Sequence, residues 1–438
     1  IEDEIPFDVP EGWAWCRLGS ISSTIQYGLS NSAELIGTHR LLRITDIQNG
    51  KVNWEKTPFT TVKDAESYLL QKGDIVFART GATVGKSFLV SETPYPVVYA
   101  SYLIRIRLLG NLPPNYLYQF FNSKCYWEQI TDKSVGVGQP NCNGTSLKEL
   151  FIPLPPVREQ FDIIPVANSL LQYVAMLEDE KESLIRIIQL TKSKILDLAI
   201  RGKLVPQDPN DEPASVLLER IRAEKEELIK QGKIKRDKKE SIIFRGDDNS
   251  YYQTPQKESI DVPYEIPDSW SWSNLKELCN YGKCENVSPD KISDDTWILD
   301  LEDIEKNSGK IIQKLANAER QTSSTKHAFA KDMILYSKLR PYLNKVVLAD
   351  SDGYCTSEII PLKFSTIIYP KYAQMFLMSP YFVEYANNCS YGMKMPRLGT
   401  RDGQAALFAI PPYQEQQRIV DMVEQLSVKF SAIEESLS

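Results

Sequence analysis

The 438-residue chain contains an internal repeat, and this repeat limits its fold more than any other feature. Residues 5–15, which end in Pro-Glu-Gly-Trp-Ala-Trp, reappear 257 positions later as residues 262–272, which end in Pro-Asp-Ser-Trp-Ser-Trp. Three further blocks keep their order and nearly the same spacing, pairing 42–47 with 298–304, 72–77 with 331–336, and 152–160 with 409–416. Chance does not preserve four blocks in this way, so the chain encodes two related structural units.

Each copy has the same internal plan. About 150 residues of short apolar runs, broken by Gly, Pro, Asn and Asp, predict strands mixed with a few short helices. A Pro-Pro pair follows, and then a pattern in which apolar residues recur at alternating steps of three and four. This spacing is typical of a coiled-coil seam. The predicted seam consists of Leu170, Val174, Leu177, Leu184, Ile188, Ile195 and Leu198 in the first helix, and of Ile419, Val423, Leu426, Phe430 and Ile433 in the second.

The helix signals divide the chain into five segments. The first long helix is expected to run from near Pro156 to Arg201 and to stop at Gly202, which makes it about 65 Å long. A shorter charged helix should follow from about residue 211 to 231. The segments are a first globular domain (1–155), the first long helix with the charged helix (156–235), a linker (236–261), a second globular domain (262–411) and a second long helix (412–438). Because this last helix is shorter than its counterpart, we expect it to be truncated.

The predicted fold class is therefore α/β, of the α+β kind. Two duplicated globular domains are joined by long antiparallel coiled-coil helices, and a pseudo-two-fold axis relates the copies. Lys181 and Thr191 interrupt the first seam. They either set the register of the helix pair or contact a partner protein.

Motifs that resemble catalytic sites do not satisfy the chemistry that such sites need. The Gly81 to Ser87 segment looks like a phosphate-binding loop, but it has three residues between its glycines instead of four. The Ile410-Pro-Pro-Tyr413 segment lacks the polar first residue with which amino-methyltransferases hold an adenine. The chain has neither a Gly-x-Ser-x-Gly nor a His-Glu-x-x-His motif, and only two histidines. We therefore expect no catalytic residues, no metal site and no cofactor in this chain.

Composition restricts the partners. The formal net charge is −7, so any contact with nucleic acid must rely on local basic patches. No apolar run approaches the roughly 18 residues that a membrane helix needs. Seven cysteines without a close Cys-x-x-Cys pair indicate reduced thiols, as in a cytoplasmic protein.

Two related units at a set separation suit duplex DNA, whose own two-fold axes let two readers approach successive grooves. At this point the sequence resembles a known family. The duplicated plan, the Pro-Pro-x-x-Glu-Gln helix starts and the segment Lys194-Ile-Leu-Asp-Leu-Ala-Ile-Arg-Gly-Lys-Leu-Val205 are similar to the specificity subunit of type I restriction-modification enzymes.

The resemblance implies a non-catalytic subunit in the cytoplasm of a prokaryote. Each globular domain would be a target-recognition domain that reads one half of a split duplex DNA site. The helices would act as a spacer and would dock methyltransferase subunits, two in number, and restriction subunits. S-adenosylmethionine, ATP and magnesium would be bound only by those partners. The low similarity between the central loops of the two copies predicts two unlike half-sites, and hence an asymmetric target.

Base recognition requires polar and basic side chains on loops that can enter a groove. The candidates after residue 74 are Arg79, Thr80, Thr83, Lys86 and Ser87, and their counterparts in the second copy are Ser337, Lys338, Arg340, Tyr342, Asn344 and Lys345. A second set near the end of each copy, which lies on the DNA side in the family, consists of Gln139 and Asn141, and of Lys394 and Arg397.

Two other classes of protein compete with this interpretation. A duplicated protein-interaction scaffold would show no sequence preference on DNA and would bind no methyltransferase. An enzyme that acts alone would bind ATP or S-adenosylmethionine as a purified chain.

Overall fold

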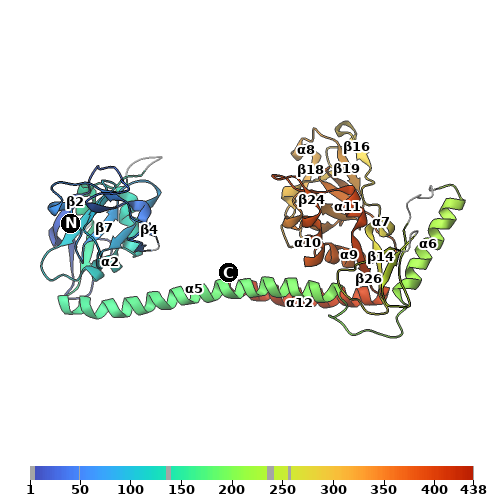
Figure 1. Ribbon diagram of the computed structural model, residues 1–438. Coiled ribbons are helices and arrows are strands. Elements are labelled where there is room, and N and C mark those ends of the chain that lie inside the picture. The colour runs from blue at the N-terminus through green and yellow to red at the C-terminus, as the bar shows by residue number, and fades with distance from the viewer. Residues whose placement is uncertain (1–4, 49, 135–139, 234–240, 255–257, 438) are drawn as a thin grey trace. The chain divides into compact units, whose positions relative to one another are not determined.

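The computed structural model describes residues 5–48, 50–134, 140–233, 241–254 and 258–437. The chain forms two compact units, unit 1 (Ile1–Asp179) and unit 2 (Glu180–Ser438) (Figure 1). The boundary between them falls inside the long helix α5 (Val157–Ile200). The predicted helix from 156 to 201 is thereby confirmed to within one residue at each end.

Unit 1 is built from small sheets, in which strands from distant parts of the sequence pair with one another. Its four-stranded sheet has the order β2-β10-β7-β8, with all neighbours antiparallel. The strands are β2 (Ser22–Tyr27), β10 (Leu103–Leu108), β7 (Ile75–Ala78) and β8 (Ser87–Leu89). A second sheet has the order β6-β3-β9, where β3 runs parallel to β9; its strands are β6 (Phe59–Thr60), β3 (His39–Leu42) and β9 (Val97–Tyr99). All four residues of β7 are buried, because both faces of this central apolar strand are covered.

The remaining elements of unit 1 close the domain. Strand β1 (Ala14–Arg17) pairs with β11 (Phe151–Leu154), so the start and the end of the globular part lie together. A hairpin is formed by β4 (Ile47–Gln48) and β5 (Lys51–Val52). The helices of this part are α1 (Leu18–Ile21), α2 (Pro114–Phe120), α3 (Lys124–Lys133) and α4 (Gly144–Lys148).

Unit 2 repeats this plan. Strand β15 (Ser271–Asn274) pairs with β26 (Leu407–Ile410), as β1 does with β11. The sheet β21-β20-β23 corresponds to β8-β7-β10, with strands β20 (Ile334–Ser337), β21 (Val346–Leu348) and β23 (Ile359–Leu362). A parallel pair that corresponds to β3 and β9 is formed by β17 (Trp297–Leu299) and β22 (Gly353–Thr356). This pair belongs to a five-stranded sheet that also contains β16 (Asn286–Val287), β18 (Leu315–Ala316) and β19 (Lys326–Phe329). The helices of this part are α7 (Leu275–Leu278), α8 (Asn317–Arg320), α9 (Pro370–Leu377), α10 (Pro380–Asn388) and α11 (Thr400–Ala405). A short antiparallel pair is formed by β24 (Ser390–Tyr391) and β25 (Arg397–Leu398).

Within unit 2, the last turns of α5 pair with the second long helix, α12 (Tyr413–Ser436) (Figure 1). Lys192 of α5 forms an ion pair of 2.8 Å with Glu434 near the end of α12. Near the start of α12, Glu415 accepts a hydrogen bond from Gln207, which lies beyond the end of α5. Because the later residue of one segment meets the earlier residue of the other, the two helices run antiparallel, as predicted.

The sequence stops α5 at Gly202. This residue has a φ of +68°, a left-handed conformation that glycine adopts without strain. The amide of Lys203 donates to the carbonyl of Leu198, which satisfies one of the free carbonyls at the helix end. A Cβ atom on Gly202 would lie 2.4 Å from the ring of Pro267, so the close approach of the second copy also requires glycine.

The predicted charged helix is confirmed as α6 (Ala214–Lys230). Its apolar face is buried in the same core as the residues of β15 and α12. Strands β12 (Ile243–Arg245), β13 (Tyr251–Gln253) and β14 (Glu258–Ile260) form a small antiparallel sheet in the region where the sequence predicts a linker.

Candidate nucleic-acid interface

The structure brings together two segments of unit 1 that the sequence analysis singled out separately. The loop after β7 lies against the segment that precedes α4, and Thr80 bridges to Asn141. The amide of Gly81 donates to the carbonyl of Pro140 at 3.0 Å, and the amide of Cys142 donates to the carbonyl of Arg79 at 2.9 Å. We call residues 79–81 together with 140–142 the loop junction of unit 1.

Unit 2 contains the same arrangement. Leu339 bridges to Arg397, the amide of Arg340 donates to the carbonyl of Pro396 at 2.7 Å, and the amide of Leu398 donates to the carbonyl of Lys338 at 3.0 Å. Residues 338–340 together with 396–398 form the loop junction of unit 2. The two junctions share their backbone bonds, so their candidate residues occupy equivalent positions in the two copies.

In each unit a two-residue turn is hydrogen-bonded to these two segments, and we include this turn in the loop junction. The turn Ser101-Tyr102 joins β9 to β10, and the amide of Arg79 donates to the carbonyl of Tyr102 at 3.1 Å. The turn Ser357-Glu358 joins β22 to β23, and the amide of Lys338 donates to the carbonyl of Glu358 at 3.0 Å. Sequence reasoning missed both turns. The repeat contains the signal that would have found them, since a serine precedes the same apolar strand in each copy.

In unit 1 the junction presents aromatic and amide groups. The guanidinium of Arg79 lies over the ring of Tyr27, 4.9 Å from its centroid. The Tyr27 hydroxyl in turn accepts a hydrogen bond of 2.6 Å from the amide of Gly144, which fixes the ring. Tyr102 and Asn141 are exposed beside Arg79. Tyr27 and Tyr102 were therefore missing from the predicted set.

In unit 2 the same positions carry charges. The guanidinium of Arg397 makes a bidentate ion pair with the carboxylate of Glu358, with a shortest distance of 2.9 Å between Nη2 and Oε1. Hydrogen bonding to Arg397 lowers the pKa of Glu358, so the carboxyl group is ionised near neutral pH. Lys338 and Arg340 are half-buried beside this pair, and Lys394 is exposed.

The phosphate-loop resemblance of unit 1 has a purely structural explanation. Gly81 and Gly85 have φ values of +72° and +88°, and Gly81 begins a single 3-10 turn, Gly81–Thr83, that ends two residues before Gly85. Unit 2 forms the same turn, Pro341–Leu343, between Arg340 and Asn344, whose φ values are +50° and +48°. The glycines thus satisfy a left-handed backbone. In unit 2, non-glycine residues adopt that conformation at a small cost.

Three predicted residues of unit 2 bind the protein itself. Ser337 is only 3% exposed, and its hydroxyl donates to the carbonyl of Leu339. The side-chain amide of Asn344 donates from Nδ2 to the carbonyl of Met378, and the ammonium of Lys345 donates to the carbonyl of Leu301 at 2.6 Å. Burial lowers the pKa of Lys345. The prediction of a DNA contact is therefore corrected for Ser337, which holds the end of its strand instead.

The other predicted residues lie on the same loops. Thr83 is half-buried and donates to the carbonyl of Thr80, Lys86 is exposed, and Ser87 begins β8. Tyr342 is exposed on the 3-10 turn of unit 2. Gln139 lies outside the residues that the structure describes.

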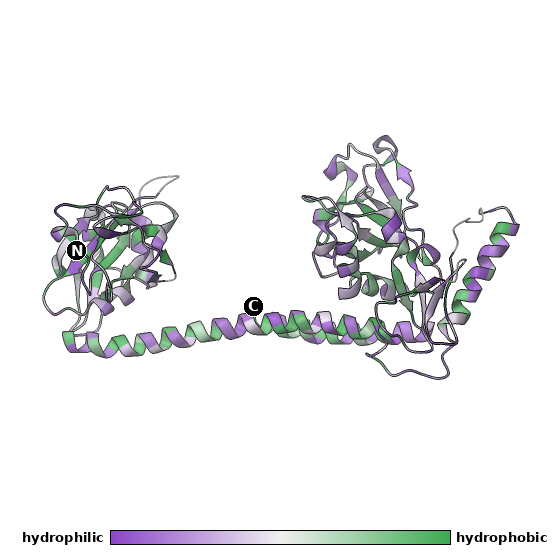
Figure 2. Cartoon of the chain, viewed as in Figure 1, coloured by the Kyte–Doolittle hydropathy of each residue, from purple (hydrophilic) through white to green (hydrophobic). Residues whose placement is uncertain are grey.

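The predicted seam is packed in only part of α5. Ile188 is buried, Ile195 and Leu198 are half-buried, and Ile419 is buried at the start of α12. Four seam residues nearer the start of α5 are exposed: Leu170, Val174, Leu177 and Leu184. Figure 2 shows hydrophobic and hydrophilic residues alternating along α5. Of the residues predicted on α12, Val423, Leu426 and Phe430 are half-buried and Ile433 is exposed.

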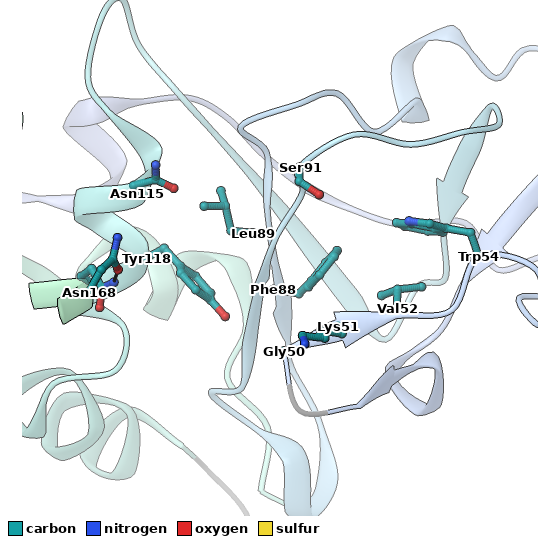
Figure 3. A pocket seen from close by; sticks show the side chains of 11 residues that line it. Gly50, Lys51, Val52, Trp54, Phe88, Leu89, Ser91, Asn115, Tyr118 and Asn168 are labelled. Atoms are coloured by element: carbon teal, nitrogen blue, oxygen red, sulfur yellow. Dashed lines mark hydrogen bonds between the residues drawn. The ribbon is translucent and has the colours of Figure 1, made fainter. Parts of the chain in front are cut away.

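A cavity of about 510 Å³ lies in unit 1 where α2 meets the first turns of α5 (Figure 3). Gln119 of α2 donates a hydrogen bond to Asn168 of α5 at its edge, and Trp54 and Phe88 form the apolar wall. In unit 2 the corresponding helices are joined by the ion pair of Lys371 with Glu424. Both contacts attach a globular domain to the start of a long helix.

Other kinds of site find little support in the described residues. In that part of the chain, no group of three or more His, Cys, Asp or Glu side chains is arranged to hold a metal ion. None of its helices combines the length and apolarity needed to cross a lipid bilayer. All seven cysteines are free thiols, and burial raises the pKa of Cys16 and of Cys142 to about 11.

Two solved structures share this fold. The chain aligns over 99% of its length with 94% of a chain from a structure concerned with complex assembly and conformational transition of the type I R-M system, at a TM-score of 0.60 and 16% identity. It also aligns over 99% of its length with 93% of the HsdS subunit from Thermoanaerobacter tengcongensis, at a TM-score of 0.52 and 16% identity. These similarities establish the fold.

Sequence comparison finds related proteins of one kind. Residues 13–184 match the type I restriction modification DNA specificity domain. The chain is 32% identical over 252 residues to the type I restriction enzyme EcoAI specificity subunit of Escherichia coli, a match that covers 55% of this chain and 39% of that protein. It is 24% identical over 406 residues to the EcoDI specificity subunit of Escherichia coli, covering 89% of this chain and 79% of that protein. The chain is thus similar to type I restriction enzyme specificity subunits along most of its length, and residues 13–184 match their DNA specificity domain.

Proposed function

We propose that this chain reads an asymmetric, bipartite site on duplex DNA, with the loop junction of each unit contacting one half-site. The observation that carries the proposal is the equivalence of the two junctions. They share their backbone hydrogen bonds, yet Arg79, Tyr102 and Asn141 in unit 1 correspond to Lys338, Glu358 and Arg397 in unit 2. A common scaffold with different side chains that reach solvent is what two readers of unlike sequences require.

The chain acts without catalysis of its own in this proposal. Its side chains position and select DNA, while methyltransferase and restriction subunits supply S-adenosylmethionine, ATP and magnesium chemistry. The exposed apolar residues of α5, including Leu170, Val174 and Leu177, support a docking role for this helix, because a lone helix rarely leaves such a stripe in water. Two methyltransferase subunits and a cytoplasmic location in a prokaryote complete the proposal.

The decisive experiment is a selection from random duplex DNA, carried out with this chain co-purified with a type I methyltransferase subunit from the same source. We expect enrichment of two short, different motifs separated by a fixed gap. Two identical motifs would contradict the asymmetric target. No enrichment by a complex that does form would favour a protein-interaction scaffold. Binding of ATP or S-adenosylmethionine by the purified chain alone would favour an enzyme.

A further inference from the structure

The bidentate pair of Arg397 and Glu358 is the clearest chemical difference between the two loop junctions. The Nε–H of Arg397 points at both oxygens of Glu358, at 3.1 and 3.0 Å, and Nη2 donates to Oε1 at 2.9 Å. Nη1 donates to the carbonyl of Met395 at 3.2 Å. In unit 1 the same two positions hold the uncharged Asn141 and Tyr102.

These bonds leave part of the guanidinium available. Arginine has five N–H donors, one on Nε and two on each terminal nitrogen. Glu358 and Met395 use the Nε donor and one donor on each terminal nitrogen. One N–H on Nη1 and one on Nη2 thus remain without a bond among the described residues. A pair of donors on adjacent nitrogens is what the O6 and N7 atoms of guanine accept in the major groove.

The carboxylate of Glu358 is unusual for a surface that faces DNA. A negative charge beside phosphates is repelled, so it costs affinity unless it has a specific bond to make. Here hydrogen bonding to Arg397 lowers the pKa of Glu358, so the group stays charged at neutral pH. The side chain is 24% exposed and that of Arg397 is 33% exposed, so both reach solvent while their backbones are held by the junction. In the major groove, the N4 amine of cytosine is the group that donates a hydrogen bond to a carboxylate.

On the basis of the function proposed above, we propose that Arg397 and Glu358 together read one G·C base pair in the half-site of unit 2. Arg397 donates to O6 and N7 of the guanine, and Glu358 accepts from N4 of the paired cytosine while it still holds the Nε edge of the arginine. Guanine O6 and cytosine N4 are partners in the same base pair, so two side chains already in contact can reach both. Asn141 and Tyr102 cannot make this pair of contacts, so the half-site of unit 1 is read by different bonds.

A charge-swapped variant separates base reading from a structural role. Glu358→Arg combined with Arg397→Glu retains an ion pair between the two positions but exchanges the donor with the acceptor. In the DNA selection described above, we expect this variant to lose the preference for G·C at one position of one half-site. The loss should be roughly tenfold or more, the discrimination that a bidentate base contact provides. The other half-site should be unchanged.

A second variant tests the same proposal if the charge-swapped protein does not fold. Arg397→Lys keeps the positive charge beside Glu358 but cannot form two parallel bonds to one base. It should lose the same preference while binding weakens little on unrelated DNA. A matched control is the swap of Arg245 and Asp268, an ion pair of 2.5 Å in unit 2 outside the loop junction, which should leave the selected motif intact.

The outcomes are distinct. Suppose that the unmodified complex selects two motifs and that both variants select the same two motifs as the unmodified complex. Arg397 and Glu358 then only stabilise the loop junction, and the base-reading proposal is wrong. If the unmodified complex selects no motif, the proposed function itself fails, and this inference fails with it. Loss of preference at one position of one half-site supports both.

Discussion

The indole Nε1 of Trp270 donates a hydrogen bond of 2.9 Å to Oε2 of Glu415, and both side chains are buried. Trp270 belongs to the repeated Pro-x-x-Trp-x-Trp block and Glu415 to the repeated Pro-Pro-x-x-Glu-Gln block. The bond therefore joins the beginning of the second globular domain to the first turn of α12. Gln207 donates to the other oxygen of the same carboxyl group, which brings the chain segment after α5 into the contact.

Replacing Glu415 by Gln should change the pH dependence of stability. Burial raises the pKa of Glu415 in the folded chain, so the folded state binds the proton more tightly than the unfolded state does. Its contribution to stability is then complete below the ordinary pKa and declines as the pH rises through the raised value. The Gln side chain stays neutral. The melting temperature of Glu415→Gln relative to the unmodified chain should therefore be more favourable at pH 8 than at pH 4.

The control is Glu159→Gln, the exposed equivalent residue in unit 1. Its relative melting temperature should show no comparable dependence on pH. An equal effect of Glu415→Gln at both pH values would mean that the buried carboxyl group does not contribute through its ionisation.

The helix pairing within unit 2 predicts that alanine substitutions two positions apart on α5 have very different effects on the free energy of unfolding. Ile188 is 3% exposed, whereas Leu190 is 63% exposed. Ile188 lies one turn before Lys192, which pairs with Glu434 of α12. Ile188→Ala should lower the free energy of unfolding by about 2 kcal/mol or more, because it leaves a cavity at a packed position. Leu190→Ala should change it by less than about 0.5 kcal/mol. Chemical denaturation of unit 2 measures both, and equal losses would contradict the pairing.

Periodicity and repetition were sufficient to predict the large elements. The three-and-four spacing predicted α5 and α12, Gly202 marked the end of α5, and the repeated blocks correspond to β1 with β11 and β15 with β26. These features depend on local chemistry: a helix needs its apolar stripe, and a left-handed cap needs glycine. Each can be recognised in a single stretch of sequence.

The candidate interface could be predicted only in part, because it is assembled from distant segments. The sequence pointed to Arg79 and Asn141 as separate candidates, but nothing in it showed that their loops are bridged. Tyr27 and Glu358 act through contacts with residues 52 and 39 positions away, so the sequence around each of them does not show which residue it contacts. Ser337 was predicted to lie on a loop that can enter a groove, whereas it is the last residue of β20 and its hydroxyl is bonded to the protein itself.

Exposed lysines near the two loop junctions should contribute to DNA affinity without selecting a sequence. Lys86 and Lys394 are solvent-exposed, so their ammonium groups are free to approach phosphates. Lys86→Ala and Lys394→Ala should each weaken binding of the methyltransferase complex to specific and unrelated DNA alike. Each should also reduce the slope of log affinity against log salt concentration by about one.

Lys72→Ala serves as the matched control for these lysines. Lys72 is also exposed, but it precedes β7, at the end of that strand opposite the loop junction, where it pairs with Glu92. Its removal should leave the salt dependence unchanged. Equal slopes for all three variants and the unmodified complex would show that the junctions do not face phosphates.

The stacking of Arg79 on Tyr27 predicts different effects for two substitutions of the tyrosine. Tyr27→Phe keeps the ring under the guanidinium but removes the hydroxyl that accepts from the amide of Gly144. Tyr27→Ala removes both, and an arginine without its stacking partner loses a contact of about 0.5–1 kcal/mol together with its fixed orientation. In DNA selection with the methyltransferase complex, Tyr27→Ala should weaken the motif of one half-site several-fold, whereas Tyr27→Phe should nearly preserve it. If instead both variants weakened the motif equally, in step with their melting temperatures, Tyr27 would serve only the fold and Arg79 would not depend on it for binding DNA.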